Sequence, residues 1–293
     1  MRVGVIDVGS NTIRLLAADV GLHGLEVVHE RRVWARLGVD VAQTGEISAE
    51  RLEAATAAVG QLAAAARRAG CLRVETLVAS PGRQASNAGE LIRALEGVSG
   101  APVRVLGREE EALLGYQGAV AAAGPFTGVV AVCDVGGGST QLAIGLPDRS
   151  PSWLRSFDIG SLRLTTEALH GDPPGKRAVN AAREVVQREL ATLVVPLPGT
   201  ALAVGGSARA VRRLVGRTLG EDELREAVSI LRKSPLRAIS KTYGVPPARA
   251  RTLLAGALIL IEVQRRLMVS FRVVAKGLRE GAVVELAARR VAA

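Results

Sequence analysis

The chain has 293 residues, more than a single hydrophobic core usually serves, so two domains are expected. Hydrophobic residues make up 48%, ample for burial, but aromatic residues only 2%, which argues against recognition of single-stranded nucleic acid by base stacking. A formal charge of +10 favours an anionic partner, such as a polyphosphate, a nucleotide or a nucleic acid, although an arginine-rich solvated surface explains it equally well.

The first half of the chain is predicted to alternate strands and helices. Strands are expected at residues 2–8, 12–20, 25–37, 74–79 and 102–106. Ser48 is a good helix cap, so helices are expected at 49–68, before Gly70, and at 85–95 and 109–123. Gly124 and Pro125 then interrupt the pattern, which predicts a hinge and a boundary between domains at 1–123 and 124–279.

The second half restarts the same pattern. Strands are expected at 128–134, 140–145, 153–158, 201–204 and 271–275. Helices are expected at 161–170, 176–193, 221–233, 235–243, 247–267 and 278–291, with another after Gly206. Three strands followed by alternating helices and strands in each half predict an α/β fold with two mixed sheets, each covered by helices.

Neither the cysteines nor the apolar segments point to an exported or membrane protein. Cys71 and Cys133 lie in or beside apolar stretches without metal-ligand spacing, which predicts reduced thiols in a cytoplasmic protein. A strand-like run follows Met1 directly, so no signal peptide is expected. The apolar run at 253–263 contains Glu262 and is shorter than the roughly 20 residues of a membrane span. It suits a buried core or an interface equally well.

Two similar turns close apolar strands, one in each half. Asp7 precedes Val-Gly-Ser10-Asn11-Thr12, and Asp134 precedes Val-Gly136-Gly137-Gly138-Ser139-Thr140. Glycine lets backbone N–H groups approach a phosphate, and hydroxyl groups add hydrogen-bond donors. An aspartate at the end of a strand can hold a metal or a water, or can simply cap the turn. Two such turns predict a cleft that holds a phosphorylated ligand from both sides.

Six short motifs occur in a fixed order along the chain. They lie at residues 7–14 (DVGSNTIR), 83–87 (RQASN), 107–116 (GREEEALLGY), 134–141 (DVGGGSTQ), 160–165 (GSLRLT) and 277–281 (GLREG). Together they resemble the exopolyphosphatase and guanosine pentaphosphate phosphohydrolase family, within the superfamily of acetate kinases, sugar kinases, Hsp70 and actin. The chain ends soon after the last motif and so resembles the short, two-domain members.

The resemblance implies two actin-like, ribonuclease H-like domains with an interdomain cleft. It implies a helix at about 280–293 that returns to the first domain, and a homodimer. The implied activity is Mg2+-dependent release of the terminal phosphate of inorganic polyphosphate, with guanosine pentaphosphate as the alternative substrate. No membrane or nucleic-acid partner is expected. A sugar or acetate kinase is disfavoured because the segments around Arg83 and Glu111 resemble the phosphatases.

The resemblance also implies catalytic and metal-binding roles. Glu111 is the expected general base, with Glu110 as the alternative register; an acidic first helical turn is the structural alternative for both. Asp134 is expected to act in catalysis and, with Asp7, to hold Mg2+. Arg83 is expected beside the reacting phosphate, because a guanidinium group matches phosphate geometry.

Phosphate contacts are expected from a larger set: Ser10, Asn11, Arg14, Gly136, Gly137, Gly138, Ser139 and Thr140. Weaker candidates are Arg163, Lys276 and Arg279. Gly205-Gly206-Ser207 is read either as a phosphate or nucleotide site or as a tight turn. A basic stripe at Arg209, Arg212, Arg213 and Arg217 fits either a guide for a long polyanion or a solvated helix face.

Gln141 departs from the family pattern, which has glutamate after Gly-Gly-Gly-Ser-Thr. Glutamine keeps a carbonyl acceptor but loses a charge, so a Mg2+ site that includes it is expected to be weaker. Two outcomes stay open. Either polyphosphate oxygens complete the metal site and activity persists, or the protein is a weakly active sensor that binds polyphosphate or an alarmone.

Overall fold

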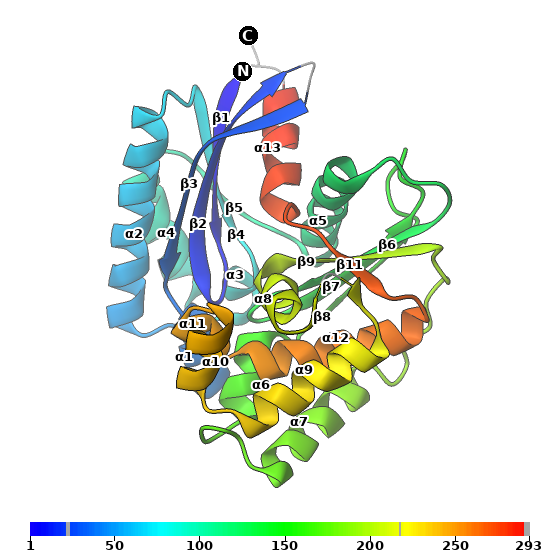
Figure 1. Ribbon diagram of the computed structural model, residues 1–293. Coiled ribbons are helices and arrows are strands. Elements are labelled where there is room, and N and C mark those ends of the chain that lie inside the picture. Colours follow the sequence, from blue (N-terminus) through cyan, green and yellow to red (C-terminus); the bar gives the residue numbers. More distant parts are fainter. Residues whose placement is uncertain (22–23, 217, 290–293) are drawn as a thin grey trace.

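The computed structural model describes residues 1–21, 24–216 and 218–289, which form two sheets with helices around them (Figure 1). The first sheet contains β1 (Arg2–Val8), β2 (Thr12–Gly21), β3 (Gly24–Trp34), β4 (Arg73–Val78) and β5 (Val103–Val105). Its strand order is β3-β2-β1-β4-β5. The pairs β1–β2 and β2–β3 are antiparallel, whereas β4 and β5 continue in parallel from β1.

The second sheet repeats this arrangement. It contains β6 (Val130–Val135), β7 (Thr140–Gly145), β8 (Trp153–Phe157), β9 (Thr200–Val204), β10 (Thr218–Leu219) and β11 (Phe271–Val273), in the order β10-β11-β9-β6-β7-β8. From β8 to β11 this is the order of the first sheet, with the short antiparallel β10 added at the edge. The predicted α/β fold with two mixed sheets is confirmed. The two-residue strand β10 was missed.

Helices cover both sheets. Those before β6 are α1 (Leu37–Thr44), α2 (Ala49–Arg68), α3 (Ser80–Gln84), α4 (Ala88–Ser99) and α5 (Arg108–Ala123). Ser48 caps α2 as predicted, because its Oγ accepts the N–H of Arg51. The sequence did not predict α1 or α3, since α1 follows a β-rich run and α3 contains the turn-forming Pro81-Gly82.

The helices of the second half are α6 (Ser161–Ala168), α7 (Lys176–Glu189), α8 (Gly205–Val215), α9 (Glu221–Lys233), α10 (Leu236–Tyr243), α11 (Pro247–Ala250), α12 (Leu253–Leu267) and α13 (Leu278–Ala288). The single helix predicted at 247–267 is wrong, because Thr252 leaves the helical conformation and separates α11 from α12. Thirteen of the fifteen α12 residues are buried, so its apolar run serves the core. Among the described helices none is long and apolar enough to cross a bilayer.

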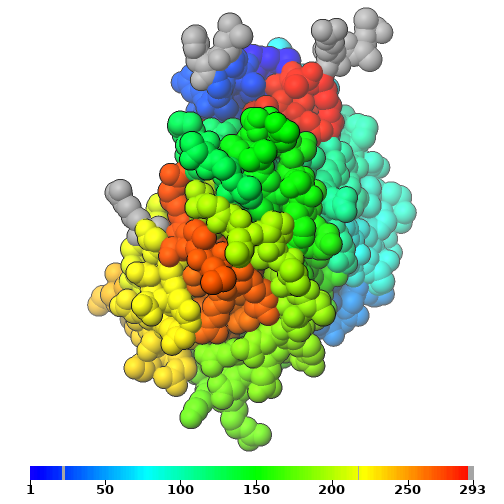
Figure 2. All heavy atoms as spheres, turned by 90° about the vertical axis from the view of Figure 1, so that its right-hand side faces the viewer, coloured from blue at the N-terminus to red at the C-terminus, as the bar shows by residue number. Residues whose placement is uncertain are grey.

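Two helices, α5 and α13, connect the halves. Tyr116 and Ala119 of α5 pack against the second sheet, whereas Val283 and Leu286 of α13 pack against the first. In Figure 2, α13 (red) accordingly lies beside the first residues of the chain (blue), away from the orange segment that precedes it. A helix was predicted to return in this way, although residues 290–293 of its range lie outside the described part. The predicted boundary at residue 124 stays a prediction, because α5 contributes to both cores.

The crossing of α5 and α13 depends on glycine. A Cβ on Gly118 would lie 1.9 Å from the carbonyl oxygen of Gly277, and one on Gly281 would lie 2.1 Å from that of Leu114. Both contacts involve backbone atoms, which cannot rotate away. The closing motif therefore contains glycine at residue 281 because two helix backbones touch there.

We expect Gly118→Ala to destabilise the protein by about 3 kcal/mol, since overpacking against backbone forces the helices apart. Gly115→Ala is the matched control three residues earlier in α5, where a Cβ meets no atom within 4 Å. That change should be neutral or stabilising by about 0.5–1 kcal/mol, because alanine favours a helix. Urea unfolding of both variants tests the contrast, and equal stabilities would contradict it.

Candidate active site

The two predicted turns have the same backbone geometry. Gly9 N–H donates to the carbonyl of Thr12 at 3.0 Å, and Gly136 N–H donates to that of Ser139 at 3.0 Å. The strand registers agree as well, because Asp7 pairs with Arg14 across β1–β2 as Asp134 pairs with Gln141 across β6–β7. Each sheet therefore presents one aspartate at the end of a central strand and one polar side chain opposite it.

The turns meet face to face. A Cβ on Gly137 would lie 3.1 Å from the Cβ of Ser10, and one on Gly138 would lie 2.5 Å from the Oγ of Ser10. Gly160 at the start of α6 supports the second turn from behind, where a Cβ would lie 2.4 Å from the carbonyl oxygen of Gly137. These glycines let the two lobes approach to backbone contact.

A polar cavity of about 110 Å³ lies between the turns. Most of the predicted site residues line it: Asp7, Ser10, Asn11, Arg14, Glu111, Asp134, Gly136, Gly137, Ser139 and Gln141. Both Nδ2 and Oδ1 of Asn11 are buried without a hydrogen-bond partner, although the side chain is 5% exposed. Unpaired buried polar groups are costly, so they indicate a place where a polar ligand binds.

Three predicted residues lie outside this lining. Gly138 packs against Ser10 and Ser80 instead of facing the space. Thr140 is fully buried and its Oγ1 donates to the carbonyl of Ile159 at 2.6 Å, so in this structure its hydroxyl group is not available to a phosphate. Arg83 reaches the cavity only through another residue.

That residue is Glu111, whose side chain is 10% exposed. Arg83 Nη2 donates to Glu111 Oε2 at 2.6 Å, and Arg83 Nη1 donates to the carbonyl of Leu106 at 2.7 Å. Burial raises the pKa of Glu111 to about 7, against the opposing effect of Arg83. A carboxyl group with this pKa suits general-base catalysis near neutral pH. Arg83 thus orients the carboxylate rather than facing the cavity itself.

Glu110 has a different environment, which bears on the register left open by the sequence. Its Oε1 accepts from Arg104 Nη1 at 2.6 Å, and its Oε2 accepts the N–H of Gly107 at 3.2 Å. Arg104 also binds Glu75 and Glu285, so Glu110 belongs to an ion-pair network that joins α5 and α13 to the first sheet. It does not line the cavity, which favours Glu111 as the base.

Asp7 and Asp134 suit a hard cation. Burial raises the pKa of Asp7 to about 6, and the charge of Asp134 adds to this. Burial likewise raises the pKa of Asp134, which Arg209 opposes. Two desolvated carboxylates that repel one another are stabilised by a divalent cation between them. Within the described ranges, no group of three or more acidic, histidine or cysteine side chains converges as a metal cluster.

Gln141 completes this donor set with an amide. Its Nε2 donates to Ser139 Oγ at 2.8 Å and to Ser156 Oγ at 3.3 Å, and the residue is 4% exposed. Mg2+ is commonly held by one or two carboxylates together with phosphate oxygens, so two aspartates and an amide carbonyl fit this ion.

Sequence reasoning missed Arg249 of α11, which also lines the cavity and is 8% exposed. Its guanidinium group lies against Gly206, where a Cβ would be 2.5 Å from Nη2, and 5.6 Å from the ring centre of Trp34 in β3. Burial and the charges of Arg209 and Arg32 lower its pKa to about 10. No motif marks Arg249, so only the tertiary structure reveals it. Gly205 and Gly206 also line the cavity, as one sequence reading proposed.

Side-chain contacts across the cleft hold the lobes together. Gln84 Nε2 of α3 donates to Asp158 Oδ1 at 3.0 Å and to the carbonyl of Gly138 at 3.3 Å. Arg108 at the start of α5 forms an ion pair with the same Asp158. The structure therefore has its two turns in contact, with a small enclosed space between them.

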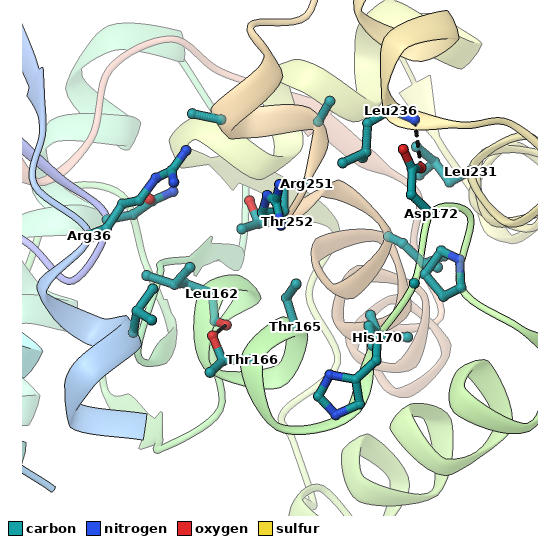
Figure 3. Close-up of a pocket in the computed structure, with 18 of the residues that line it drawn as sticks. Arg36, Leu162, Thr165, Thr166, His170, Asp172, Leu231, Leu236, Arg251 and Thr252 are labelled. Atoms are coloured by element: carbon teal, nitrogen blue, oxygen red, sulfur yellow. Dashed lines mark hydrogen bonds between the residues drawn. The ribbon is translucent and has the colours of Figure 1, made fainter. Parts of the chain in front are cut away.

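A second, larger cavity of about 580 Å³ adjoins the first at Asn11 (Figure 3). Leucine and threonine side chains of α6 form one wall, and Leu231 and Leu236 lie opposite. Arg36 and Arg251 lie on the side nearer the first lobe, and His170 near the outer end. This lining is mixed rather than strongly charged.

Comparison with known proteins agrees with this geometry. Residues 16–290 match the model of the Ppx/GppA phosphatase family. The chain belongs to this family. The family resemblance identified from the six sequence motifs is therefore confirmed.

Relatives within the Ppx/GppA family match nearly the whole chain. Exopolyphosphatase 1 of Mycobacterium tuberculosis is 28% identical over 302 residues, covering 97% of this chain and 88% of the relative. Exopolyphosphatase 2 of the same organism is 31% identical over 295 residues, covering 91% of each. The crystal structure of the Aquifex aeolicus Ppx/GppA family member superposes with a TM-score of 0.81 at 26% identity, covering 98% of this chain and 97% of that one.

Proposed function

We propose that this Ppx/GppA protein is an exopolyphosphatase that releases orthophosphate from the end of inorganic polyphosphate. The observation that carries the proposal is the position of Glu111, oriented by Arg83, in the same cavity as both glycine turns and both aspartates. The exopolyphosphatases of Mycobacterium tuberculosis, which match nearly full length, support it.

In the proposed reaction the terminal phosphate lies between the two turns. Donors from Asn11, Arg14 and Arg249 neutralise its oxygens. Glu111 removes a proton from a water whose oxygen forms a bond to the terminal phosphorus, and the bridging P–O bond breaks. Orthophosphate leaves, and the chain is one phosphate shorter.

We infer that Asp7, Asp134 and the carbonyl of Gln141 hold Mg2+ in this cavity. The ion when bound would neutralise phosphate oxygens as charge develops. This inference rests on the paired buried carboxylates and on the oxygen donor set.

The direct experiment is to incubate the protein with long polyphosphate and Mg2+ and to measure orthophosphate. We expect steady release that stops when EDTA is added. Shortening of the chain by one unit at a time, resolved on a gel, would distinguish attack at the end from internal cleavage. Absence of orthophosphate with both polyphosphate and guanosine pentaphosphate would refute the proposal.

Guanosine pentaphosphate phosphohydrolysis is the second candidate, and the second cavity favours it. This cavity adjoins the catalytic one at Asn11, is partly apolar, and its 580 Å³ would accommodate a nucleoside. Parallel assays with guanosine pentaphosphate and polyphosphate decide between the substrates through the ratio of kcat/KM values.

Gln141→Glu should lower the Mg2+ concentration for half-maximal activity by about tenfold, because it adds a charged ligand. The change fits locally, since the hydroxyl groups of Ser139 and Ser156 can donate to a carboxylate instead of accepting from the amide. A magnesium titration of orthophosphate release measures this. If wild-type protein binds polyphosphate with little turnover and the variant gains activity, the sensor alternative is favoured.

We also propose that the protein is a cytoplasmic homodimer, as the family resemblance implied. Its two cysteines are free in the structure, in agreement with a reducing compartment. Sedimentation analysis of the full chain measures the oligomeric state.

A further inference from the structure

A basic groove of about 540 Å³ runs outward from the catalytic cavity. It lies between β2 and β3 of the first sheet on one side and α8 and the start of α13 on the other. Six basic side chains, two carboxylates and only two apolar residues line it: Arg14, Arg31, Arg32, Arg209, Lys276, Arg279, Glu30, Glu280, Val27 and Ala275. We refer to these residues as the basic groove.

The two carboxylates of the basic groove are already engaged. Glu30 Oε1 pairs with Arg279 Nη1 at 2.5 Å. Glu280 Oε2 accepts the N–H of Gly277 at 2.7 Å, and its Oε1 lies 3.8 Å from Arg279 Nη2. In the described part of the chain, no carboxylate forms an ion pair with the other five basic residues: Arg14, Arg31, Arg32, Arg209 and Lys276. The basic groove therefore carries an excess of positive charge.

Arg14 joins the basic groove to the catalytic cavity, because it lines both. Its Nε is buried without a hydrogen-bond partner. Burial and the charges of Arg279 and Arg209 lower its pKa to about 9. Burial and Arg279 lower the pKa of Arg209 as well. Buried cations that repel one another are stabilised by an anion bound between them.

We propose that the basic groove holds the polyphosphate chain beyond the phosphates that occupy the catalytic cavity. Arg14 and Arg209 lie at its inner end, and Arg31 and Lys276 contact more distant phosphates. The proposal rests on the exopolyphosphatase function and adds the path of the substrate. A repeating anion suits this lining, because every phosphate unit brings charge and the basic groove offers little apolar surface to a base.

The second cavity is the competing path, and its charges are less suited to a polyanion. Arg51 there is paired with Asp40 at 2.7 Å, and Asp172 adds a negative charge beside the apolar walls (Figure 3). The basic stripe of α8 contributes one member, Arg209, to the basic groove. Arg212 and Arg213 are exposed elsewhere on that helix, and Arg217 lies outside the described residues.

Two double variants with equal loss of charge separate the paths. Arg31→Gln with Lys276→Gln neutralises the outer part of the basic groove, and Arg36→Gln with Arg251→Gln neutralises the second cavity. At low ionic strength we expect the groove variant to lose about tenfold in kcat/KM on long polyphosphate but less than about twofold on tripolyphosphate, which needs only the inner sites. The control variant should lose less than about twofold on either substrate.

Equal losses on both chain lengths in the groove variant, or a larger loss on long chains in the control, would overturn the proposal. The same preparations are tested for binding of fluorescent end-labelled long polyphosphate. There we expect about tenfold weaker binding in the groove variant alone. If wild-type protein hydrolyses neither substrate, the exopolyphosphatase function fails, whereas the binding comparison still decides whether the basic groove holds the polyanion.

Discussion

Glu111→Gln should lower kcat for orthophosphate release by about 10³-fold, because general-base catalysis contributes roughly 10²–10⁴-fold. Polyphosphate binding should change little, since glutamine keeps the shape of the side chain and an acceptor for Arg83 Nη2. Glu110→Gln is the matched control. It removes the same charge one residue away but affects only the ion-pair network with Arg104, so we expect turnover within about twofold of wild type. Steady-state assays of both variants provide the test. Full activity of the Glu111 variant would end its assignment as the base.

The pH profile tests the same role independently. A general base acts when it has lost its proton, so kcat/KM should rise with pH through about 7, the pKa of buried Glu111 in the free protein. Below that pH the carboxyl group is protonated and cannot accept a proton from water. The variant with glutamine should lack this rise. A wild-type profile that is flat between pH 5 and 9 would argue against Glu111.

Asp134→Asn is expected to have the second largest effect, a decrease of about 10²-fold in activity together with at least about tenfold more Mg2+ needed for half-maximal rate. Removing one of only two carboxylates leaves Asp7 and neutral amides to hold the ion. Its partner charge also falls, so the pKa of Asp7 should decrease, because Asp134 helps to raise it.

Asp172→Asn is the control for charge alone. Asp172 lines the second cavity, and its Oδ1 accepts the N–H of Leu236 at 2.7 Å, an acceptor role that asparagine keeps. Magnesium titrations of both variants make the comparison. If the two requirements for Mg2+ are the same, Asp134 does not hold the metal.

Local patterns predicted most of the fold. The strand ends, the cap at Ser48 and the long helix that follows depend on neighbouring residues, so they can be read from the sequence. The failures lie where local and tertiary preferences differ. The segment Pro81-Gly82 favours a turn but forms part of α3, and Thr252 interrupts a helix that periodicity alone would continue.

The sequence by itself determined the doubled Asp-Gly turns, the acidic residue at 111 and the family, because each is a short run whose chemistry and spacing are local. Only the tertiary structure decided which groups share one space. It turns the hydroxyl group of Thr140 toward Ile159, pairs Arg83 with Glu111, and brings Arg249 to the cavity from a helix more than a hundred residues away in the chain. It also gathers the basic groove from strands and helices of both lobes. These positions depend on the packing of distant segments, which no local pattern encodes.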